Sequence, residues 1–371
     1  MRTIIFLIKK EFLQIFRDKF IGKAIFGIPI VQMLILVPAI TFEIKSARLC
    51  IIDNDMTAES RGLISKLEGS PFFSIVQATS SGKEANDLLY GNKTDLVLHI
   101  PQEFGRDLGL GKSAKVMASV NAINAMTAQL SWAYLSGVIR DYNIDIIVSA
   151  NPAAAAMMAS PSITYRYWYN EMLNYRHYML PGILVILVMA IGFILAGLNM
   201  VREKEIGTIE QINVTPVKKY QFVTAKMVPF LVIGLIDLAI GLGIGKLLFD
   251  IPFEGSLFLL FLCSAFFLVA ALGMALFLST MSGTQQQFMF MAFFFMIIFI
   301  LMSGIFTPLE SMPVWAQKID LLNPVAYLMR IYRMIMLKGS AYADIERDIF
   351  ALVAIAVVFT ALAINRYRKT A

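Results

Sequence analysis

The residues of this chain best suited to chemistry are charged groups that follow or interrupt apolar segments. Segment 202–216 reads REKEIGTIEQINVTP and combines charges with isoleucines at positions 206, 209 and 212. Asp237 is the one acid in the 19-residue apolar run 227–245. An aspartate at the bilayer centre costs roughly 2.5–3.5 kcal/mol, so such residues usually face a bundle interior or a water-filled path. Asp237 is therefore a candidate pathway residue, with a helix-packing hydrogen bond as the alternative.

Segment 202–216 has the pattern of a short helix that needs a surface to lie on. Gly207 interrupts it and Pro216 ends it, so the helical part is too short to be stable alone. It is expected to lie on the bilayer or dock into a partner. A plain connecting loop with interfacial charges is the alternative interpretation.

Residues for soluble enzyme chemistry are scarce. The chain has only 2 histidines and 2 cysteines, which argues against a His/Cys metal site. Gly111-Lys112-Ser113 resembles the end of a phosphate-binding loop, but the required first glycine is replaced by Arg106. The sequence therefore predicts no catalytic residues, no metal site and no cofactor within this chain, which is expected not to be an enzyme by itself.

The elements that position these residues are membrane spans. The chain is 58% hydrophobic and 16% charged, whereas soluble domains are roughly 45–50% apolar and about 25% charged. Uncharged or nearly uncharged runs of about 18 residues or more indicate transmembrane helices. Six such runs, the last 16 residues long and extendable, cover 24–42, 179–201, 227–245, 255–280, 288–307 and 349–364. The predicted fold is a polytopic α-helical membrane protein with six transmembrane helices.

Basic residues predict the orientation. Lys and Arg gather in segment 1–23, loop 202–226 and the tail after 365, which six spans place on one side. Positively charged short loops stay in the cytoplasm, so both termini are expected inside and residues 43–178 outside. The net charge of +6 lies beside apolar stretches, which favours anionic lipid over nucleic acid as its partner.

Residues 43–178 are predicted to form an α/β domain inserted between the first span, in segment 21–42, and the second span, which begins at residue 179. Strand-like and helix-like patterns alternate there. Strands are expected at 47–53, 72–77, 95–100 and 115–120, and helices at 57–67, 82–90 and 125–149.

Residues 1–20 are predicted to form an amphipathic helix. Apolar residues recur at helical spacing from Ile4 and Ile8 to Ile15, while Lys9 and Lys10 occupy other faces. Basic helices with one apolar face lie in the membrane interface. This helix is expected to lie flat before the first span.

Further pathway candidates lie in spans one and five. Gln32 is a polar residue in the first span, and Phe294 and Met296 belong to a Phe- and Met-rich stretch, 288–296. A soft surface of this kind suits variable apolar cargo. Lipid contact, dimer packing and interhelical hydrogen bonding remain alternatives.

Segment 202–216 resembles the loop after the second span of ABC-2 type permeases, the transmembrane subunits of ATP-binding cassette exporters. Segment 303–333, SGIFTPLESMPVWAQKIDLLNPVAYLMRIYR, resembles the family's region between spans five and six. The inserted domain resembles that of the long, drug-exporter-like branch. The resemblance covers essentially the whole chain.

The resemblance implies a dimer, with itself or a similar subunit, each half bound to a cytoplasmic ABC ATPase that holds ATP and Mg. Residues 308–338 would form a re-entrant segment on the outer side, broken at Pro308, Pro313, Asn323 and Pro324. The residues that would couple to the ATPase are Arg202, Glu203, Glu205, Gly207, Thr208, Glu210, Gln211 and Pro216. The location would be the bacterial inner membrane. The cargo, whether lipid, hydrophobic drug or toxic ion, and a periplasmic adaptor are left open.

Two other function classes are compatible with parts of the sequence. An ion-coupled secondary transporter would use Asp237 as its coupling residue, but such proteins usually show internal repeats and broken helices at matched positions. A receptor or adhesin would use the outer domain and would not need a charged loop inside. The exporter permease is the preferred interpretation.

Overall fold

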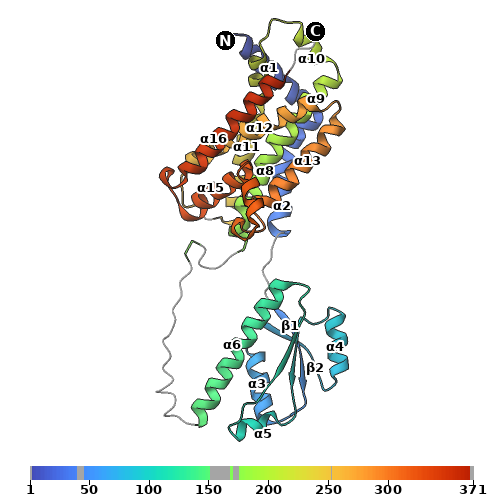
Figure 1. Ribbon diagram of the computed structural model, residues 1–371, viewed down its shortest axis with the longest axis vertical. Helices are drawn as coiled ribbons and strands as arrows, with labels where there is room; N and C mark the ends of the chain where they lie inside the picture. The colour runs from blue at the N-terminus through green and yellow to red at the C-terminus, as the bar shows by residue number, and fades with distance from the viewer. Residues whose placement is uncertain (1, 40–45, 151–167, 170–174, 252, 368–371) are drawn as a thin grey trace. The chain divides into compact units, whose positions relative to one another are not determined.

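The computed structural model describes residues 2–39, 46–150, 168–169, 175–251 and 253–367. The chain divides into two compact units, Met1–Thr41 together with Arg166–Ala371, and Phe42–Tyr165. We call the first the helical unit and the second the sheet unit (Figure 1). Residues 40–42 of the predicted first span, and 43–45, 151–167 and 170–174 of the predicted domain 43–178, lie outside the described residues. Each unit is described by itself.

The helical unit contains the membrane spans. Five helices in the described ranges are long and apolar enough to cross a membrane. They are Tyr175–Glu205, which is continuous through α8 (Tyr175–Ala190), the π-helical turn η1 (Ile191–Leu195) and α9 (Ala196–Glu205), and α11 (Lys219–Phe249), α12 (Leu257–Met281), α13 (Gln285–Met302) and α16 (Tyr342–Arg366). The helix predicted as the first span is α2 (Lys19–Ala39), whose apolar part, Ile25–Ala39, is shorter. The chain is a multi-pass membrane protein.

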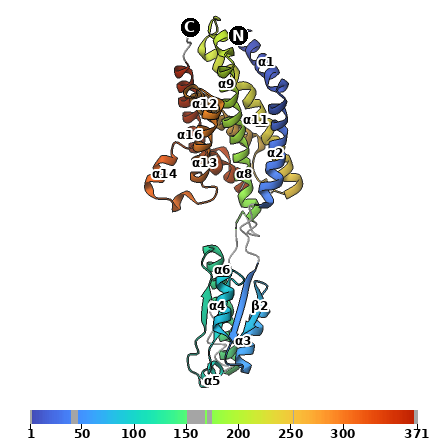
Figure 2. The same ribbon diagram turned by 90° about the vertical axis from the view of Figure 1, so that its right-hand side faces the viewer.

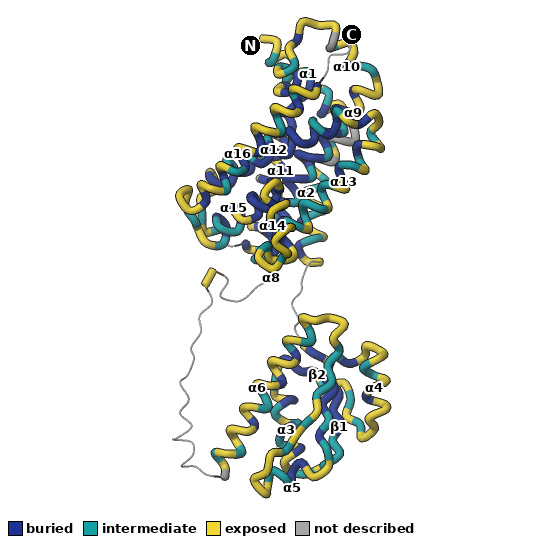
Figure 3. The backbone as a smooth tube through the Cα atoms, in the orientation of Figure 1, coloured by how far each residue is buried: buried dark blue, intermediate teal, exposed yellow. Residues whose placement is uncertain are grey.

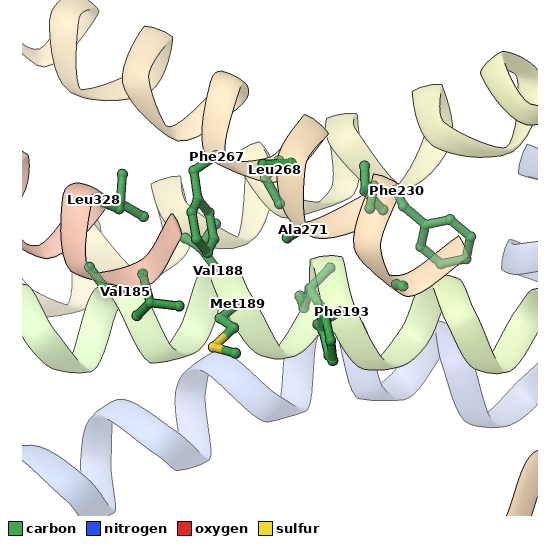
Figure 4. Packing of buried hydrophobic residues seen from close by; sticks show 14 of the residues in the cluster. Val185, Val188, Met189, Phe193, Phe230, Phe267, Leu268, Ala271 and Leu328 are labelled. Carbon is green, nitrogen blue, oxygen red and sulfur yellow. The ribbon is translucent and has the colours of Figure 1, made fainter. Parts of the chain in front are cut away.

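The continuous helix α8–η1–α9 is the most enclosed of these spans. Its most apolar window is 83% buried, whereas that of α13 is 11% buried. Figure 4 shows Val188 of this helix beside Phe267 of α12, and Phe193 belongs to the same buried cluster. A Cβ added at Gly197 would collide with the ring of Phe288, so α9 and α13 approach closely there. Figure 3 shows the buried backbone concentrated in the middle of the helical unit.

Two short helices lie at the end of the helical unit where α9 and α16 finish (Figures 1 and 2). They are α1 (Arg2–Arg17), the predicted amphipathic helix, and α10 (Thr208–Asn213). The predicted segment 308–338 consists of η2 (Leu309–Ser311), α14 (Val314–Asp320) and α15 (Pro324–Lys338), of which α15 packs on α8, α12 and α16.

The sheet unit contains a four-stranded sheet in the order β2-β1-β3-β4, with β4 antiparallel and the others parallel. Its strands are β1 (Ala47–Asp53), β2 (Phe73–Thr79), β3 (Leu96–Ile100) and β4 (Met117–Val120). Its helices are α3 (Ala58–Glu68), α4 (Gly82–Tyr90), α5 (Phe104–Gly109) and α6 (Ala125–Ala150). The strands and helices predicted between 47 and 149 are present, with ends that differ by up to two residues.

Alternation along β1 explains the layers of the sheet unit, because successive side chains of a strand point to opposite faces. Leu49 and Ile51 join one core with residues of α3, α5 and α6. Cys50 and Ile52 join a smaller core with Ala85 of α4. Helices therefore cover both faces of the sheet.

An ion pair at the sheet surface links the neighbouring strands β1 and β3. The Arg48 guanidinium donates to Asp95 from Nε at 3.0 Å and from one terminal nitrogen at 2.8 Å, and the Arg48 backbone N–H donates at 2.9 Å. These hydrogen bonds hold the pKa of the Asp95 carboxyl below its ordinary value. The Arg48 side chain remains 45% exposed.

Candidate coupling site

Segment 202–216 forms the end of α9, a sharp turn and α10. The turn is made by Gly207, whose φ of +80° lies in the left-handed region that glycine adopts without strain. The Thr208 hydroxyl donates to the Glu203 carbonyl at 3.1 Å and fastens α10 to α9. The predicted interruption at Gly207 is thus the point where the chain turns from one helix into the other.

Glu203 lies inside the protein, at the centre of a group of side chains from three helices. We call this group the buried ion cluster, and its members are Lys10 and Glu11 of α1, Asn199 and Glu203 of α9, and Lys226 of α11. The side chains of Glu11, Glu203 and Lys226 are each 2% exposed.

The distances in the buried ion cluster make it a closed network. Lys226 Nζ lies 3.1 Å from Glu11 Oε2 and 2.8 Å from Glu203 Oε2, and donates to Asn199 Oδ1 at 2.7 Å. Lys10 Nζ donates to Glu11 at 2.9 Å and to Glu203 at 2.5 Å. Two ammonium groups thus balance two carboxylates, as a buried charge requires. Burial lowers the pKa of Lys10, but the charges of Glu11 and Glu203 outweigh that effect and raise it.

Further contacts hold the base of the segment. Arg202 forms an ion pair with Asp18, which follows α1. Lys204 donates to the Ser282 carbonyl at 2.7 Å, after α12. The Glu205 carboxylate accepts from the backbone N–H of Gln285 at 2.7 Å and from its side-chain amide, at the start of α13. The end of α9 is therefore connected to α1, α11, α12 and α13.

The far part of the segment faces outward. Ile206 is 65% exposed and Val214 is 82% exposed. Glu210, Gln211 and Pro216 are also exposed. Of the eight predicted coupling residues, Arg202, Glu203 and Glu205 contact the rest of the helical unit. Thr208 forms a hydrogen bond within the segment, and Gly207 shapes the turn. The remaining three lie on the surface of the helical unit.

Sequence reasoning did not assign Lys10, Glu11, Asn199 or Lys226 to the site. A signal existed for Glu11, because at 3.6 residues per turn it shares a face with Ile4 and Ile15, where an acid needs a partner. Lys226 gave no such signal, since a lysine just before an apolar run reads as an interfacial charge. Its partners lie 215 and 23 residues away in sequence.

Asp237 is fully buried in α11, at 0% exposure. Neither of its carboxylate oxygens has a hydrogen-bond partner among the described residues. The helix around it packs closely on α12 and α8, because Cβ atoms added at Gly234 and Gly241 would lie 2.8 Å from Leu268 and Leu187. The predicted helix-packing hydrogen bond is therefore not made by any described residue.

The other pathway candidates, Gln32, Phe294 and Met296, differ from Asp237 in burial and in hydrogen bonding. The Gln32 amide donates to the Ile183 carbonyl at 3.2 Å, so it joins α2 to α8. Phe294 is 61% exposed and Met296 half-buried on α13. Gln32 thus makes the interhelical hydrogen bond that was the alternative interpretation.

The prolines of segment 308–338 each precede or begin a short element. Pro308 and Pro313 are exposed and stand immediately before η2 and α14. Asn323 caps α15, since its side chain accepts from the Val325 backbone N–H at 3.0 Å, and Pro324 is the first residue of that helix. The Asn323 amide also donates to the Phe299 carbonyl at 2.9 Å and to Asp320 at 2.8 Å.

Within the described ranges, no three His, Cys, Asp or Glu side chains are grouped so that they could hold a metal ion. The buried ion cluster contains carboxylates, but its two lysines occupy the place that a cation would take. The arrangement can transmit a movement, because it connects the turn at Gly207 to α1, α9 and α11 of the helical unit.

Comparisons with known proteins agree with this architecture. The profile of a family described as "ABC-2 family transporter protein" matches residues 24–365. The "Probable multidrug ABC transporter permease YbhR" of Escherichia coli K12 is 28% identical over 364 residues, which cover 98% of this chain and 97% of that protein. "Probable multidrug ABC transporter permease YbhS" is 24% identical over 97% and 95% of the two chains. "Inner membrane transport permease YhhJ" is 23% identical over 87% and 86%.

These matches extend across the spans, the sheet unit and segment 202–216. The family implies an ATPase component as a partner. The chain belongs to the ABC-2 family of transporter proteins.

Proposed function

We propose that this chain is the permease subunit of an ABC exporter that moves a hydrophobic or amphipathic substrate out of the cytoplasm or the inner leaflet. The energy would come from ATP hydrolysis in a separate ATPase subunit, which would hold the ATP and Mg. The relatives named as multidrug permeases support this substrate class. The exposed, aromatic surface of α13 is compatible with it.

The observation that carries the proposal is the two-sided nature of segment 202–216. Its base is fixed by the buried ion cluster to α1 and α11, while Ile206, Glu210 and Gln211 face outward. A short helix with exposed apolar and charged residues needs a docking surface. A partner that pushed on α10 would move α9, and with it the most enclosed span.

We propose the orientation that the basic segments predict. Both termini and segment 202–216 would be cytoplasmic, and the sheet unit would lie outside the bacterial inner membrane. Helix α2 would be the first of six spans, with Lys19 and Lys23 at its cytoplasmic end. Segment 308–338 would then be the re-entrant element on the outer side.

We further propose a dimer of permease subunits, formed with a second copy or a similar chain. Helix α13 supports this, because its apolar window is only 11% buried within one chain. Lipid would cover the rest of that surface. A periplasmic adaptor is compatible with an outward sheet unit.

The test is co-purification with the ATPase subunit encoded beside this chain. We expect Glu210→Ala with Gln211→Ala to lower ATPase binding or stimulation at least about tenfold, because both side chains are exposed and would lie in the interface. Glu346→Ala, at an exposed site near the start of α16, is the matched control and should change neither. An unmodified chain that never binds the ATPase would refute the exporter function.

A second candidate is an ion-coupled secondary transporter, and one observation favours it. Asp237 is buried with both oxygens unpaired among the described residues, as a proton- or cation-binding carboxylate would be. Flux measured in vesicles without ATP distinguishes the two functions. Flux that follows a proton gradient and stops in Asp237→Asn would support this candidate over the exporter.

A further inference from the structure

We propose that the cavity between α1 and the end of α9 binds the phosphate headgroup of an anionic phospholipid. The cavity has a volume of about 560 Å³. Three of its lining residues are cations, Lys10 and Arg17 of α1 and Arg202 of α9, and one is an acid, Asp18. Charge complementarity therefore favours an anion as the occupant.

The three cations are not equally engaged. Lys10 belongs to the buried ion cluster, and Arg202 pairs with Asp18. Arg17 has no ion-pair or hydrogen-bond partner among the described residues, and its side chain is exposed. Its guanidinium offers five donors in a planar fork that matches a phosphate. Arg17 is the residue on which binding should depend most.

The position of the cations around α1 suits a lipid headgroup. At 3.6 residues per turn, Leu13, Arg17, Lys10 and Gln14 follow one another around the helix, from the outward face to the protein. The outward face is uncovered by the described chain and carries the apolar residues Ile5, Phe6, Leu13 and Phe16 together with the cations Arg2 and Lys9, all of them exposed. In a multi-pass membrane protein such a face lies in the bilayer interface. Arg17 and Lys10 then stand at the boundary where phosphates lie.

The rim of the cavity favours a lipid over a free phosphate. Leu13 is 54% exposed and Ile206 is 65% exposed, and both line the cavity. Free phosphate would gain nothing from these side chains, whereas the glycerol and upper acyl carbons of a lipid would cover them. The side-chain amides of Gln14 and Asn199 in the same wall add polar contacts for the headgroup.

The inference rests on the proposed function in one respect, the cytoplasmic-side position of α1 and segment 202–216. Anionic lipid of that leaflet attracts Lys and Arg near the surface. A bound headgroup would join α1 to Arg202 and Ile206, directly before the turn at Gly207. Lipid binding itself needs no ATPase, so it can be measured whether or not the exporter function holds.

The experiment is native mass spectrometry of the purified full chain after titration with phosphatidylglycerol or phosphatidylcholine. We expect phosphatidylglycerol to bind saturably and with higher affinity than phosphatidylcholine. Arg17→Gln should weaken it about fivefold, which corresponds to one basic side chain near a lipid phosphate. Arg17→Gln with Arg202→Gln should weaken it further. An unchanged elution volume and helical circular dichroism would show that the variants are folded.

Lys9→Gln is the matched control, because Lys9 is exposed on the same helix but does not line the cavity. It should leave affinity within about twofold. Equal losses in Lys9→Gln and Arg17→Gln would mean general electrostatic attraction and would overturn the site. So would equal binding of both lipids.

Two further arms identify the occupant. Inorganic phosphate that displaces phosphatidylglycerol at comparable concentration would make the occupant a free phosphate and overturn the lipid proposal. Arg17→Gln that keeps full lipid affinity but loses ATPase binding would make the cavity a protein-docking surface, and would also overturn it.

Discussion

The helical unit and the sheet unit place ion pairs in opposite surroundings. In the sheet unit, Arg48 and Asp95 pair at the surface, with the arginine side chain 45% exposed. In the helical unit, Lys226 lies between Glu11 and Glu203, and all three side chains are 2% exposed. The Arg48–Asp95 pair stays partly solvated. The charges of Lys226, Glu11 and Glu203 are shielded from water, so each depends on the others for stabilisation.

This difference sets what each pair contributes. An exposed pair typically stabilises a protein by about 0.2–1 kcal/mol. A buried pair contributes little net free energy when formed, but removing one partner costs about 3–5 kcal/mol because the other charge stays buried. The buried ion cluster is therefore best understood as a constraint on where α1, α9 and α11 lie relative to one another.

The largest effect is expected from Lys226→Met. It leaves two buried carboxylates with only Lys10, so the free energy of unfolding should fall by about 3–5 kcal/mol. SDS denaturation of the purified chain measures this. Lys226→Met with Glu11→Gln restores the charge balance and should recover part of the loss. No change in either variant would show that the cluster is not a constraint.

Asp237→Leu tests a buried acid whose side-chain oxygens have no hydrogen-bond partner among the described residues. Leucine has the same number of side-chain heavy atoms and removes an unpaired carboxylate, so stability should rise by about 1–3 kcal/mol. The same denaturation experiment measures it, beside export activity. A more stable chain that no longer transports would assign Asp237 to function. A loss of stability would mean that the carboxylate has a partner we have not identified.

Gly207→Val separates backbone strain from charge. No atom lies within 4 Å of a Cβ added there, so the whole effect arises from φ at +80°. A β-branched residue in this conformation should cost about 1–2 kcal/mol. ATPase stimulation should fall with it, because α10 would be displaced. Gly207→Asn is the control, since asparagine tolerates the left-handed region, and it should retain most stimulation.

The smallest effect is expected from Asp95→Asn, at about 0.2–1 kcal/mol. Arg48 lowers the folded-state pKa of Asp95, so the pair stabilises the fold above the unfolded-state value of about 3.9. That contribution is lost as the pH falls through the lower folded-state pKa. Hydrogen exchange of β1 amides in the full chain should show this acid-side loss, and Asp95→Asn should abolish it. A loss of more than about 1 kcal/mol in Asp95→Asn at neutral pH would contradict an exposed, weak pair.

Local patterns predicted the sheet unit well. Alternation of apolar residues and turn signals placed β1, β2 and β3 within about two residues. This works because the pattern that identifies a strand lies entirely within the strand and its flanking turns. The spans were likewise visible as runs without charge. For α2 the described apolar part is Ile25–Ala39, and residues 40–42 of the predicted first span lie outside the described residues.

The site was only partly predictable for a different reason. Segment 202–216 was identified, but Glu203 was predicted to couple to the ATPase like its neighbours, whereas it is buried against Lys10 and Lys226. Its environment depends on residues of two other helices, and no local pattern records which faces of these helices meet. The positive φ of Gly207, in contrast, is a property of the residue type and could be expected from the interruption it makes.

The π-helical turn Ile191–Leu195 gives the most enclosed span one residue more than a regular helix would use over that stretch. An extra residue of this kind offsets everything beyond it by roughly 100° around the helix axis. The direction in which the Asn199 and Glu203 side chains point around the helix axis is thus determined by the π-helical turn that precedes them. Deleting one residue of this turn would leave the composition of the span almost unaltered, yet rotate its last two turns so that Glu203 no longer points at Lys226.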